Sequence, residues 1–233
     1  MQLFYNISIT TQTTQYVFPK EESKHIVRVL RKSVGDSILI TNGKGQLFKG
    51  VIAAANPNKC LVKTALKETQ PPIPYRLHMA VAPTKLNDRF EWFLEKATEI
   101  GITEITPILC HHSERKTIKL ERYEKIIQSA MKQSLRYHLP KLNELTPISE
   151  ILKSAKESNK TIAHCESGTK MKLKDWVIPN QDILILIGPE GDFSTQEIAT
   201  ALEHNFTAIS LGDARLRTET AAIAACHTVA LMQ

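Results

Sequence analysis

Residues 182–220 read DILILIGPEGDFSTQEIATALEHNFTAISLGDARLRTET, and this stretch decides the fold. Two apolar runs, 183–187 and 207–211, each end at a loop that begins with glycine. Short apolar runs bounded by turn residues are typical of strands buried in a parallel sheet. Between them, Ser194 and Glu197 have the spacing of a capping box, which predicts the start of a helix. Both loops would then leave the carboxyl ends of strands, where open α/β sheets bind ligands, so a pocket is predicted there.

The rest of the second half of the chain repeats this alternation of strand and helix. Apolar runs predict further strands at 77–83, 104–109 and 161–165. Apolar residues at helical spacing predict helices at 86–100, 120–137, 148–157 and 219–232. Strands that alternate with helices predict an α/β domain with a mainly parallel sheet.

Residues 1–70 have a different pattern, with short strands and tight turns. β-Branched and aromatic residues predict strands at 3–10, 15–18, 37–41, 46–54 and 59–66. One short helix is predicted at 21–30. This pattern predicts a compact β-barrel. The prolines of 71–74 predict an extended linker, so we expect two domains, 1–70 and 75–233.

The excess positive charge of the chain lies in the predicted barrel. Residues 1–70 hold ten Lys and Arg against four Asp and Glu, whereas residues 71–233 hold twenty of each. A basic module beside a neutral one favours a polyanionic partner, nucleic acid first, and ordinary solvated surface charge is the alternative. The candidate phosphate contacts are the cationic and imidazole residues on or just after the barrel helix: His25, Arg28, Arg31 and Lys32.

Several classes of protein are excluded by what the sequence lacks. No apolar run approaches the roughly 20 residues of a membrane span, and the N-terminus lacks the layout of a signal peptide, so we expect a cytoplasmic protein. The four cysteines stand singly, which predicts neither a metal site nor a disulfide framework. The fingerprints of dinucleotide-binding, P-loop, metalloprotease and serine-hydrolase sites are absent.

The two glycine loops are best interpreted as a ligand site built from backbone and a few side chains. Gly188 and Gly191 allow the backbone to approach a flat ligand closely, and Glu190 adds a carboxylate. In the second loop Leu216 is an apolar wall and Arg217 a cation. A tight strand-to-helix turn is the structural alternative for the first loop taken alone.

Five segments together resemble one family. They are IGPEG…FS..E (187–197), LG…LR.ETA (211–221), H..RVLR..VGD (25–36), KATEIGITEITP (96–107) and A..QS.R...P (130–140). In this order they resemble the ribosomal small-subunit RNA uridine-N3 methyltransferases, the RsmE family of the SPOUT superfamily.

The resemblance implies a PUA-like β-barrel followed by a SPOUT-type α/β methyltransferase domain with a C-terminal trefoil knot. It implies S-adenosyl-L-methionine as cofactor, a homodimer packed through the knot region, and methylation of the N3 of a specific uridine in 16S ribosomal RNA within the small subunit. Carried over by position, the cofactor-binding residues are Glu166, Ile187, Gly188, Pro189, Glu190, Gly191, Leu211, Gly212, Leu216 and Arg217. The chain departs from the family at Asp192, where glycine is common, and at 214–216, where Ala-Arg-Leu replaces Arg-Ile-Leu.

The chemistry of that reaction suggests roles for three residues. Uracil N3 carries a proton, so its attack needs a base or a cation that stabilises the uracil anion. Arg217 is the candidate cation, and Glu219 and Glu190 are candidate bases. Further RNA contacts are expected at Lys85, Arg89, Lys96, Gln133 and Arg136. Two alternatives stay open: a SPOUT methyltransferase acting on another RNA or on a ribose 2′-oxygen, and a non-catalytic ribosome-assembly factor that binds RNA.

Overall fold

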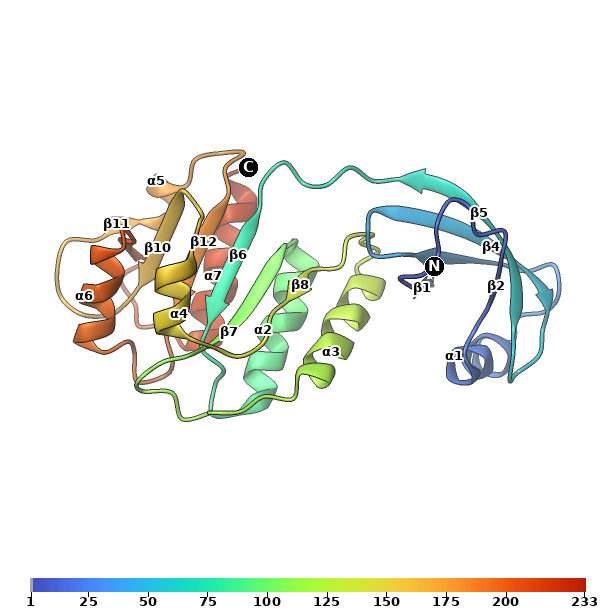
Figure 1. Cartoon of the computed structure of the whole chain (residues 1–233), viewed down its shortest axis with the longest axis horizontal. Coiled ribbons are helices and arrows are strands. Elements are labelled where there is room, and N and C mark those ends of the chain that lie inside the picture. The colour runs from blue at the N-terminus through green and yellow to red at the C-terminus, as the bar shows by residue number, and fades with distance from the viewer. Residues whose placement is uncertain (1) are drawn as a thin grey trace. The chain divides into compact units, whose positions relative to one another are not determined.

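The computed structural model describes residues 2–233 (Figure 1). Contacts between Cα atoms divide the chain into two compact units. The first consists of Met1–Pro72 together with Met131–Leu139, and the second of Ile73–Ala130 with Pro140–Gln233. The nine residues from Met131 to Leu139, which the sequence analysis included in the range 75–233, are thus grouped with the first unit.

The first unit is a half-barrel formed by one five-stranded sheet. Its strand order is β1 (Leu3–Tyr5), β3 (Ser37–Thr41), β4 (Gln46–Ala54), β5 (Leu61–Thr69) and β2 (Gln15–Val17). Only the β1–β3 pair is parallel. The predicted helix is present as α1 (Lys20–Lys24), which continues as the π-helical turn η1 (His25–Val29). Phe4, Ile26 and Phe48 are among the buried residues that fill the concave side.

Two predicted boundaries in this unit were wrong, for local reasons. β1 ends at Tyr5 because the Asn6 side chain accepts a hydrogen bond from the amide of Ser8 at 2.8 Å, which starts a turn. The helix predicted to Tyr137 is α3 (Leu120–Gln133), and Leu135, just beyond it, has φ +54°. Residues 137–139 instead bond to the turn between β3 and β4: Gly45 N donates to Tyr137 O at 2.8 Å, and Leu139 N to Gly43 O at 2.9 Å.

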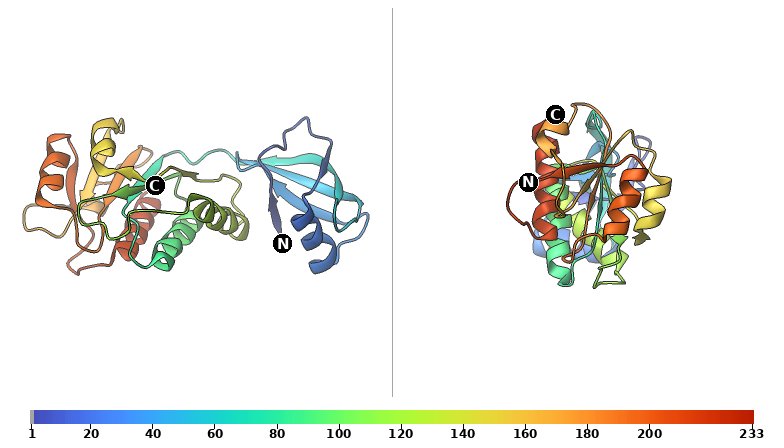
Figure 2. Two further views of the ribbon diagram at one scale, coloured as in Figure 1. Left: turned by 60° about the horizontal axis from the view of Figure 1, so that its bottom comes forward. Right: turned by 90° about the vertical axis from the view of Figure 1, so that its left-hand side faces the viewer.

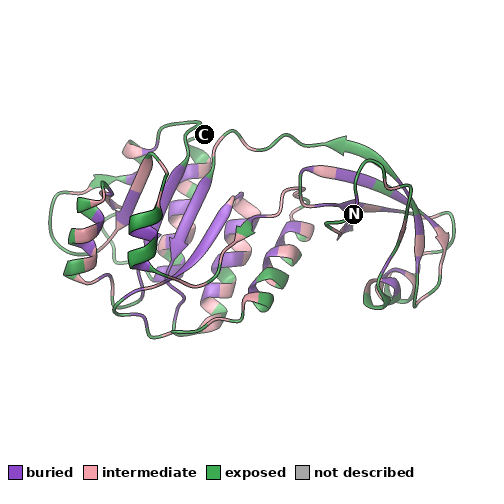
Figure 3. Ribbon diagram, in the orientation of Figure 1, coloured by how far each residue is buried: buried purple, intermediate pink, exposed green. Residues whose placement is uncertain are grey.

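The second unit is built on a parallel sheet, as predicted. Its strand order is β11 (Met171–Lys172), β13 (Thr207–Ser210), β10 (Asn159–Ala163), β12 (Ile183–Ile187), β6 (Leu77–Val81), β7 (Glu104–Leu109) and β8 (Lys141–Leu142), with β9 (Thr146–Pro147) also on β7. Every pairing in this sheet is parallel. All five residues of β6 and of β12 are buried, which explains why these strands are continuous apolar runs (Figure 3).

Helices cover both faces of this sheet. The view along the sheet in Figure 2 has α2 (Asn87–Ile100) and α7 (Thr218–Leu231) on one face, and α4 (Ile148–Ser154) and α6 (Thr195–Glu203) on the other. The short α5 (Leu173–Trp176) contacts α7. No helix within residues 2–233 is long and apolar enough to cross a membrane.

The predicted start of α6 is confirmed. Ser194 accepts a hydrogen bond from the amide of Glu197 at 3.3 Å, and the Glu197 carboxylate accepts from the amide of Ser194 at 2.8 Å. The helix therefore begins directly after the β12 loop, and that loop opens at the carboxyl edge of the sheet.

Candidate active site

A cavity of about 560 Å³ lies at the carboxyl ends of β10, β12 and β13. Three loops line it: one after β10 with His164, Cys165 and Lys170, one after β12, and one after β13. The floor includes Ile187 and Ile209 from the strand ends and Thr218 and Ala221 from the start of α7. The pocket predicted at this edge from the two glycine loops is present.

The loop 188–191 is held closely against its surroundings. A Cβ added to Gly188 would lie 3.1 Å from the Phe193 ring, so a side chain is excluded there unless the ring moves. The carbonyl oxygen of Gly188 accepts a hydrogen bond from the Thr218 hydroxyl at 3.1 Å, which joins the loop to α7. Glu190 Oε1 accepts from the amide of Lys85 at 2.9 Å, which fixes the carboxylate at the rim.

Asp192 connects three loops. It has φ +63°, a conformation that glycine adopts without strain and that aspartate tolerates better than most residues. Its carboxylate accepts from the amide of Cys165 at 2.7 Å and from that of Phe193 at 2.8 Å. Its carbonyl oxygen lies 3.1 Å from His112 Nδ1, in the loop after β7. The side chain of Asp192 therefore ties the β10 loop to the β12 loop.

The third loop, 211–217, is the most exposed wall. Gly212 has φ +138°, which requires glycine, and a Cβ there would meet nothing within 4 Å. Asp213, Arg215, Leu216 and Arg217 are exposed and line the cavity. Arg217 is also the residue that precedes the first turn of α7.

The structure brings most of the predicted cofactor residues together, but not all. Those lining the cavity are Ile187, Gly188, Pro189, Glu190, Leu211, Gly212, Leu216 and Arg217. Glu166 and Gly191 instead line an adjoining cavity of about 410 Å³, where the Glu166 carboxylate accepts from the Thr195 hydroxyl at 3.0 Å.

Glu219 does not line the cavity. It is buried in the first turn of α7 and faces α2, where its Oε1 lies 3.8 Å from Arg89 Nε. Its other oxygen, Oε2, is buried with no hydrogen-bond partner among residues 2–233.

His164 and Lys170 line the cavity and were not predicted as site residues. His164 directly follows β10, as Gly188 follows β12. Lys170 Nζ donates to the carbonyl oxygens of His164 at 2.9 Å and Glu166 at 2.6 Å, which closes this loop on itself. One sequence feature could have indicated His164: it is a polar residue directly after the apolar run 161–163.

The predicted RNA contacts are distributed over both units. In the first unit, Arg28 and Arg31 are exposed in and just after η1, His25 Nε2 lies 3.2 Å from the side-chain nitrogen of Gln2, and Lys32 follows. Gln133 and Arg136 belong to the segment grouped with this unit.

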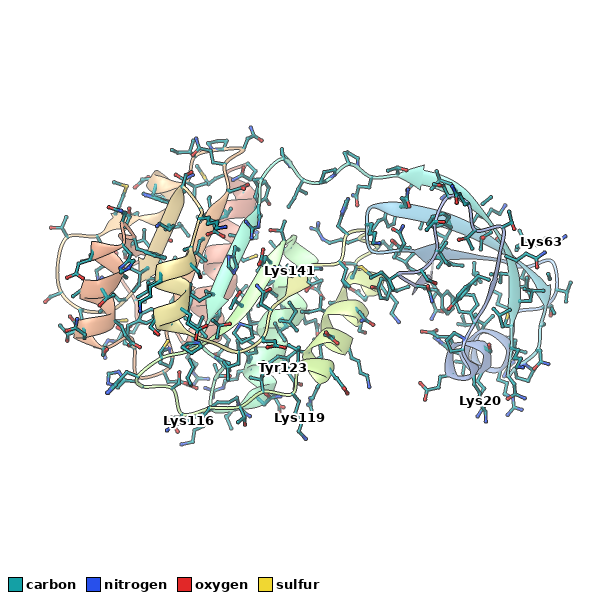
Figure 4. All side chains as sticks on the ribbon, viewed as in Figure 1. Lys20, Lys63, Lys116, Lys119, Tyr123 and Lys141 are labelled. Carbon is teal, nitrogen blue, oxygen red and sulfur yellow. The ribbon has the colours of Figure 1, made fainter. Side chains whose placement is uncertain are left out.

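In the second unit, all three predicted contacts are already ion-paired: Lys85 with Glu114 at 2.7 Å, Arg89 with Glu219 at 3.8 Å, and Lys96 with Glu95 and Glu99. Lys116 and Lys119, which were not predicted, are exposed in the segment before α3 (Figure 4). Within residues 2–233, no group of three or more His, Cys, Asp or Glu residues is arranged to hold a metal.

A separate polar cluster lies at the opposite edge of this sheet, near the amino ends of β6 and β7. Glu104 is buried there and accepts from Arg76 Nε at 3.0 Å, Asn143 at 2.8 Å and Lys141 at 3.1 Å. Burial alone would raise the pKa of Glu104, but the hydrogen bonds from Asn143 and Arg76 outweigh it and lower the pKa to about 2. His78 bridges Glu157 at 3.0 Å and Thr106 at 2.7 Å.

Two family models match the chain. One, described as an RNA methyltransferase domain, matches residues 71–230, and the other, described as an RNA methyltransferase PUA domain, matches residues 18–64. The unit built on the parallel sheet is therefore an RNA methyltransferase domain.

Relatives define the family more narrowly. Ribosomal RNA small subunit methyltransferase E of Rickettsia conorii is 30% identical over 89% of this chain and 86% of its own length. A probable rRNA-methyltransferase of Porphyromonas gingivalis is 41% identical, with TM-score 0.92 over 100% of this chain and 98% of that one. The structure of the methyltransferase E of Neisseria gonorrhoeae, bound to S-adenosyl methionine, is 26% identical, with TM-score 0.86 over 97% and 96%. The chain belongs to the ribosomal RNA small subunit methyltransferase E family.

Proposed function

We propose that this protein transfers a methyl group from S-adenosyl-L-methionine to the N3 atom of one uridine in 16S ribosomal RNA. The observation that carries the proposal is the cavity between the three loops, which Arg217 and Glu190 help to line. The chain's membership of this methyltransferase family gives the cavity its meaning. The relatives that are ribosomal RNA small subunit methyltransferases support the RNA class. The N3 position rests on the resemblance of the motifs.

The residues of the cavity fit the cofactor. Its volume of about 560 Å³ is within the usual range for a site that encloses a small molecule. Gly188 and Gly212 present backbone rather than side chains, which allows a flat ring to approach. Buried Nδ1 of His164, without a partner among residues 2–233, offers a hydrogen bond to a ligand.

The cofactor supplies an electrophilic methyl group, so the protein has to make the uracil nitrogen nucleophilic. We assign Glu190 as the proton acceptor, because it lines the cavity and the Lys85 amide holds it in place. Arg217 would stabilise the negative charge that develops on a uracil oxygen when N3 loses its proton. The N3–H bond breaks and the proton passes to the carboxylate. The electron pair left on N3 would form the new N–C bond as the bond between the methyl group and sulfur breaks, with that bond's pair left on the departing sulfur.

Glu219 is the second candidate for the proton acceptor. Its unpaired Oε2 favours it, but it lies outside the cavity lining and faces Arg89. We therefore assign it to holding Arg89 for RNA. The Watson–Crick edge of the target base has to be free for this reaction, so we infer that the uridine is unpaired or flipped out when it binds.

We infer that residues 1–70 and the segment with Gln133 and Arg136 bind the RNA backbone, and that 75–233 carry out catalysis, joined by the linker 71–74. The concentration of cations in 1–70 supports the first part. Ribosomal RNA as substrate implies that the protein acts in the cytoplasm, on the small subunit or its RNA.

We also propose that the protein forms a homodimer and that the C-terminal part of its chain forms a trefoil knot. Exposed apolar side chains support the dimer: Trp92 of α2 is 47% exposed and Leu231 of α7 is 70% exposed. The route of the chain supports the knot, because loop 211–217 runs from β13 to α7, which packs against β12 and β6 on the far side of β10.

Mass mapping of 16S ribosomal RNA from cells lacking this protein tests the proposal. We expect the loss of one N3-methyluridine, restored by the wild-type protein. If every N3-methyluridine persists and a different RNA or a ribose 2′-oxygen loses its methyl group, the assigned substrate is wrong. If no methyl group is lost, the alternative that the protein is a non-catalytic assembly factor is favoured.

A further inference from the structure

Two buried side-chain atoms lack a hydrogen-bond partner within residues 2–233: Nδ1 of His164 and Oε2 of Glu219. A buried polar atom without a partner costs folding free energy, so such an atom calls for an explanation. His164 lines the cavity, whereas Glu219 does not. The unpaired nitrogen of His164 therefore belongs to a residue that a ligand in this cavity would contact.

The position of His164 is fixed from several sides. It follows the last residue of β10, the strand between β12 and β13. Its carbonyl oxygen accepts from Lys170 Nζ at 2.9 Å, and the amide of the next residue, Cys165, donates to Asp192 at 2.7 Å. The backbone that carries the ring is therefore held in place before a ligand binds.

The ring is neutral at physiological pH. Burial lowers the pKa of His164, and the nearby Lys170 charge lowers it further, against smaller opposite effects of Asp192 and Glu166. A neutral imidazole has one nitrogen that donates and one that accepts. The other charged residues that line the cavity are Glu190, Asp213, Arg215 and Arg217.

We propose that His164 Nδ1 accepts a hydrogen bond from an uncharged donor, an amino or hydroxyl group, on the nucleoside part of the cofactor. This inference rests on the proposed function. The sulfonium has no proton to donate and the α-amino group carries a positive charge, so the uncharged donors of the cofactor all belong to its nucleoside. Protonation of the ring removes the acceptor, so cofactor affinity falls as the pH drops through the pKa of His164.

Isothermal titration calorimetry on the full-length protein tests this, with S-adenosyl-L-methionine and its uncharged product S-adenosyl-L-homocysteine as probes. His164→Ala is expected to weaken both ligands about fivefold, the usual effect of one lost hydrogen bond. Both ligands carry the same nucleoside, so we expect an equal loss for the two, and a loss for the sulfonium ligand alone would overturn the assignment. His227→Ala, an exposed histidine of α7, is the matched control and should bind as the wild type does.

A second variant separates ligand binding from folding. His164→Asn places an amide oxygen near the position of Nδ1 but does not titrate, so it should bind near wild-type affinity at pH 7.5. As the pH falls from 7.5 through the pKa of His164, the affinity of this variant should change less than that of the wild type. Wild-type affinity in His164→Ala, with an unchanged melting temperature, would overturn the inference and leave the proposed function intact. A wild-type protein that binds neither ligand would instead overturn the proposed function.

Discussion

The carboxylate of Asp192 accepts a hydrogen bond from the backbone amide of Cys165 at 2.7 Å, so the loop after β12 is tied to the loop after β10. Both loops line the cavity. A glycine at this position would have no side chain to make this bond, so this tie between the two loops depends on the aspartate.

Replacing Asp192 tests that tie. Asp192→Gly should weaken cofactor binding about fivefold, because one loop-to-loop hydrogen bond is lost. The melting temperature should change little, since glycine relieves the cost of φ +63°. Asp192→Asn, which keeps an accepting oxygen, should bind more tightly than Asp192→Gly in calorimetry. Equal affinities for glycine, asparagine and aspartate would show that the tie does not shape the cavity.

Gly188 and Gly212 should resist substitution for different reasons. Gly188→Ala should cost about 1–3 kcal/mol of unfolding free energy, because the new methyl group would lie 3.1 Å from the Phe193 ring. Gly212→Ala should cost about 2 kcal/mol through backbone strain alone, since no atom lies near but φ is +138°.

Chemical denaturation of double variants distinguishes the two causes. Phe193→Leu should recover part of the loss in Gly188→Ala and none of the loss in Gly212→Ala. Additive effects in both double variants would rule out the steric explanation for Gly188.

The Glu104 cluster should make stability depend on pH. Its folded-state pKa, about 2, lies below the ordinary value of 4.5, so the carboxylate stabilises the fold above pH 4.5. That stabilisation, about 3 kcal/mol, is lost as the pH falls toward 2. Glu104→Gln should thus destabilise the protein at pH 7 and much less at pH 3. Urea unfolding measures this, with the exposed Glu150→Gln as a control that should match the wild type at pH 7.

Cations of the first unit should contribute to RNA affinity without affecting the cofactor. Arg28→Ala combined with Lys32→Ala should lower the slope of log affinity against log salt by roughly one to two. Cofactor affinity should stay unchanged. Fluorescence anisotropy with a 16S RNA fragment provides the measurement, and Lys153→Ala on α4, which removes one exposed cation of the second unit, is the control. An unchanged salt slope in the double variant would remove these residues from the RNA contact.

Local signals in the sequence predicted much of this molecule. The run at 183–187 became the fully buried β12, because burial on both faces requires continuous apolar side chains. The run at 207–211 became β13, in which Ile209 is buried and the other residues are half-buried. The Ser194–Glu197 box marked the start of α6, since a helix cap needs only residues three apart.

Features that depend on residues distant in the chain were missed. Asn143 and Arg76 meet Glu104 only after β6, β7 and the segment after β8 come together. The end of α3 was missed because residues 137–139 bond to the turn between β3 and β4, nearly a hundred positions earlier. The role suggested for His164 depends on a missing partner, which no sequence pattern records.

Methyl transfer by the purified protein tests the central claim most directly. Wild-type protein and Arg217→Ala would each be incubated with methyl-labelled S-adenosyl-L-methionine and small subunits from cells lacking the protein, and the product nucleosides identified by mass spectrometry. We predict N3-methyluridine with the wild type and none with Arg217→Ala, whose cofactor affinity stays within a few fold of the wild type. Undiminished transfer by Arg217→Ala, or label on an atom other than uridine N3, would contradict the account.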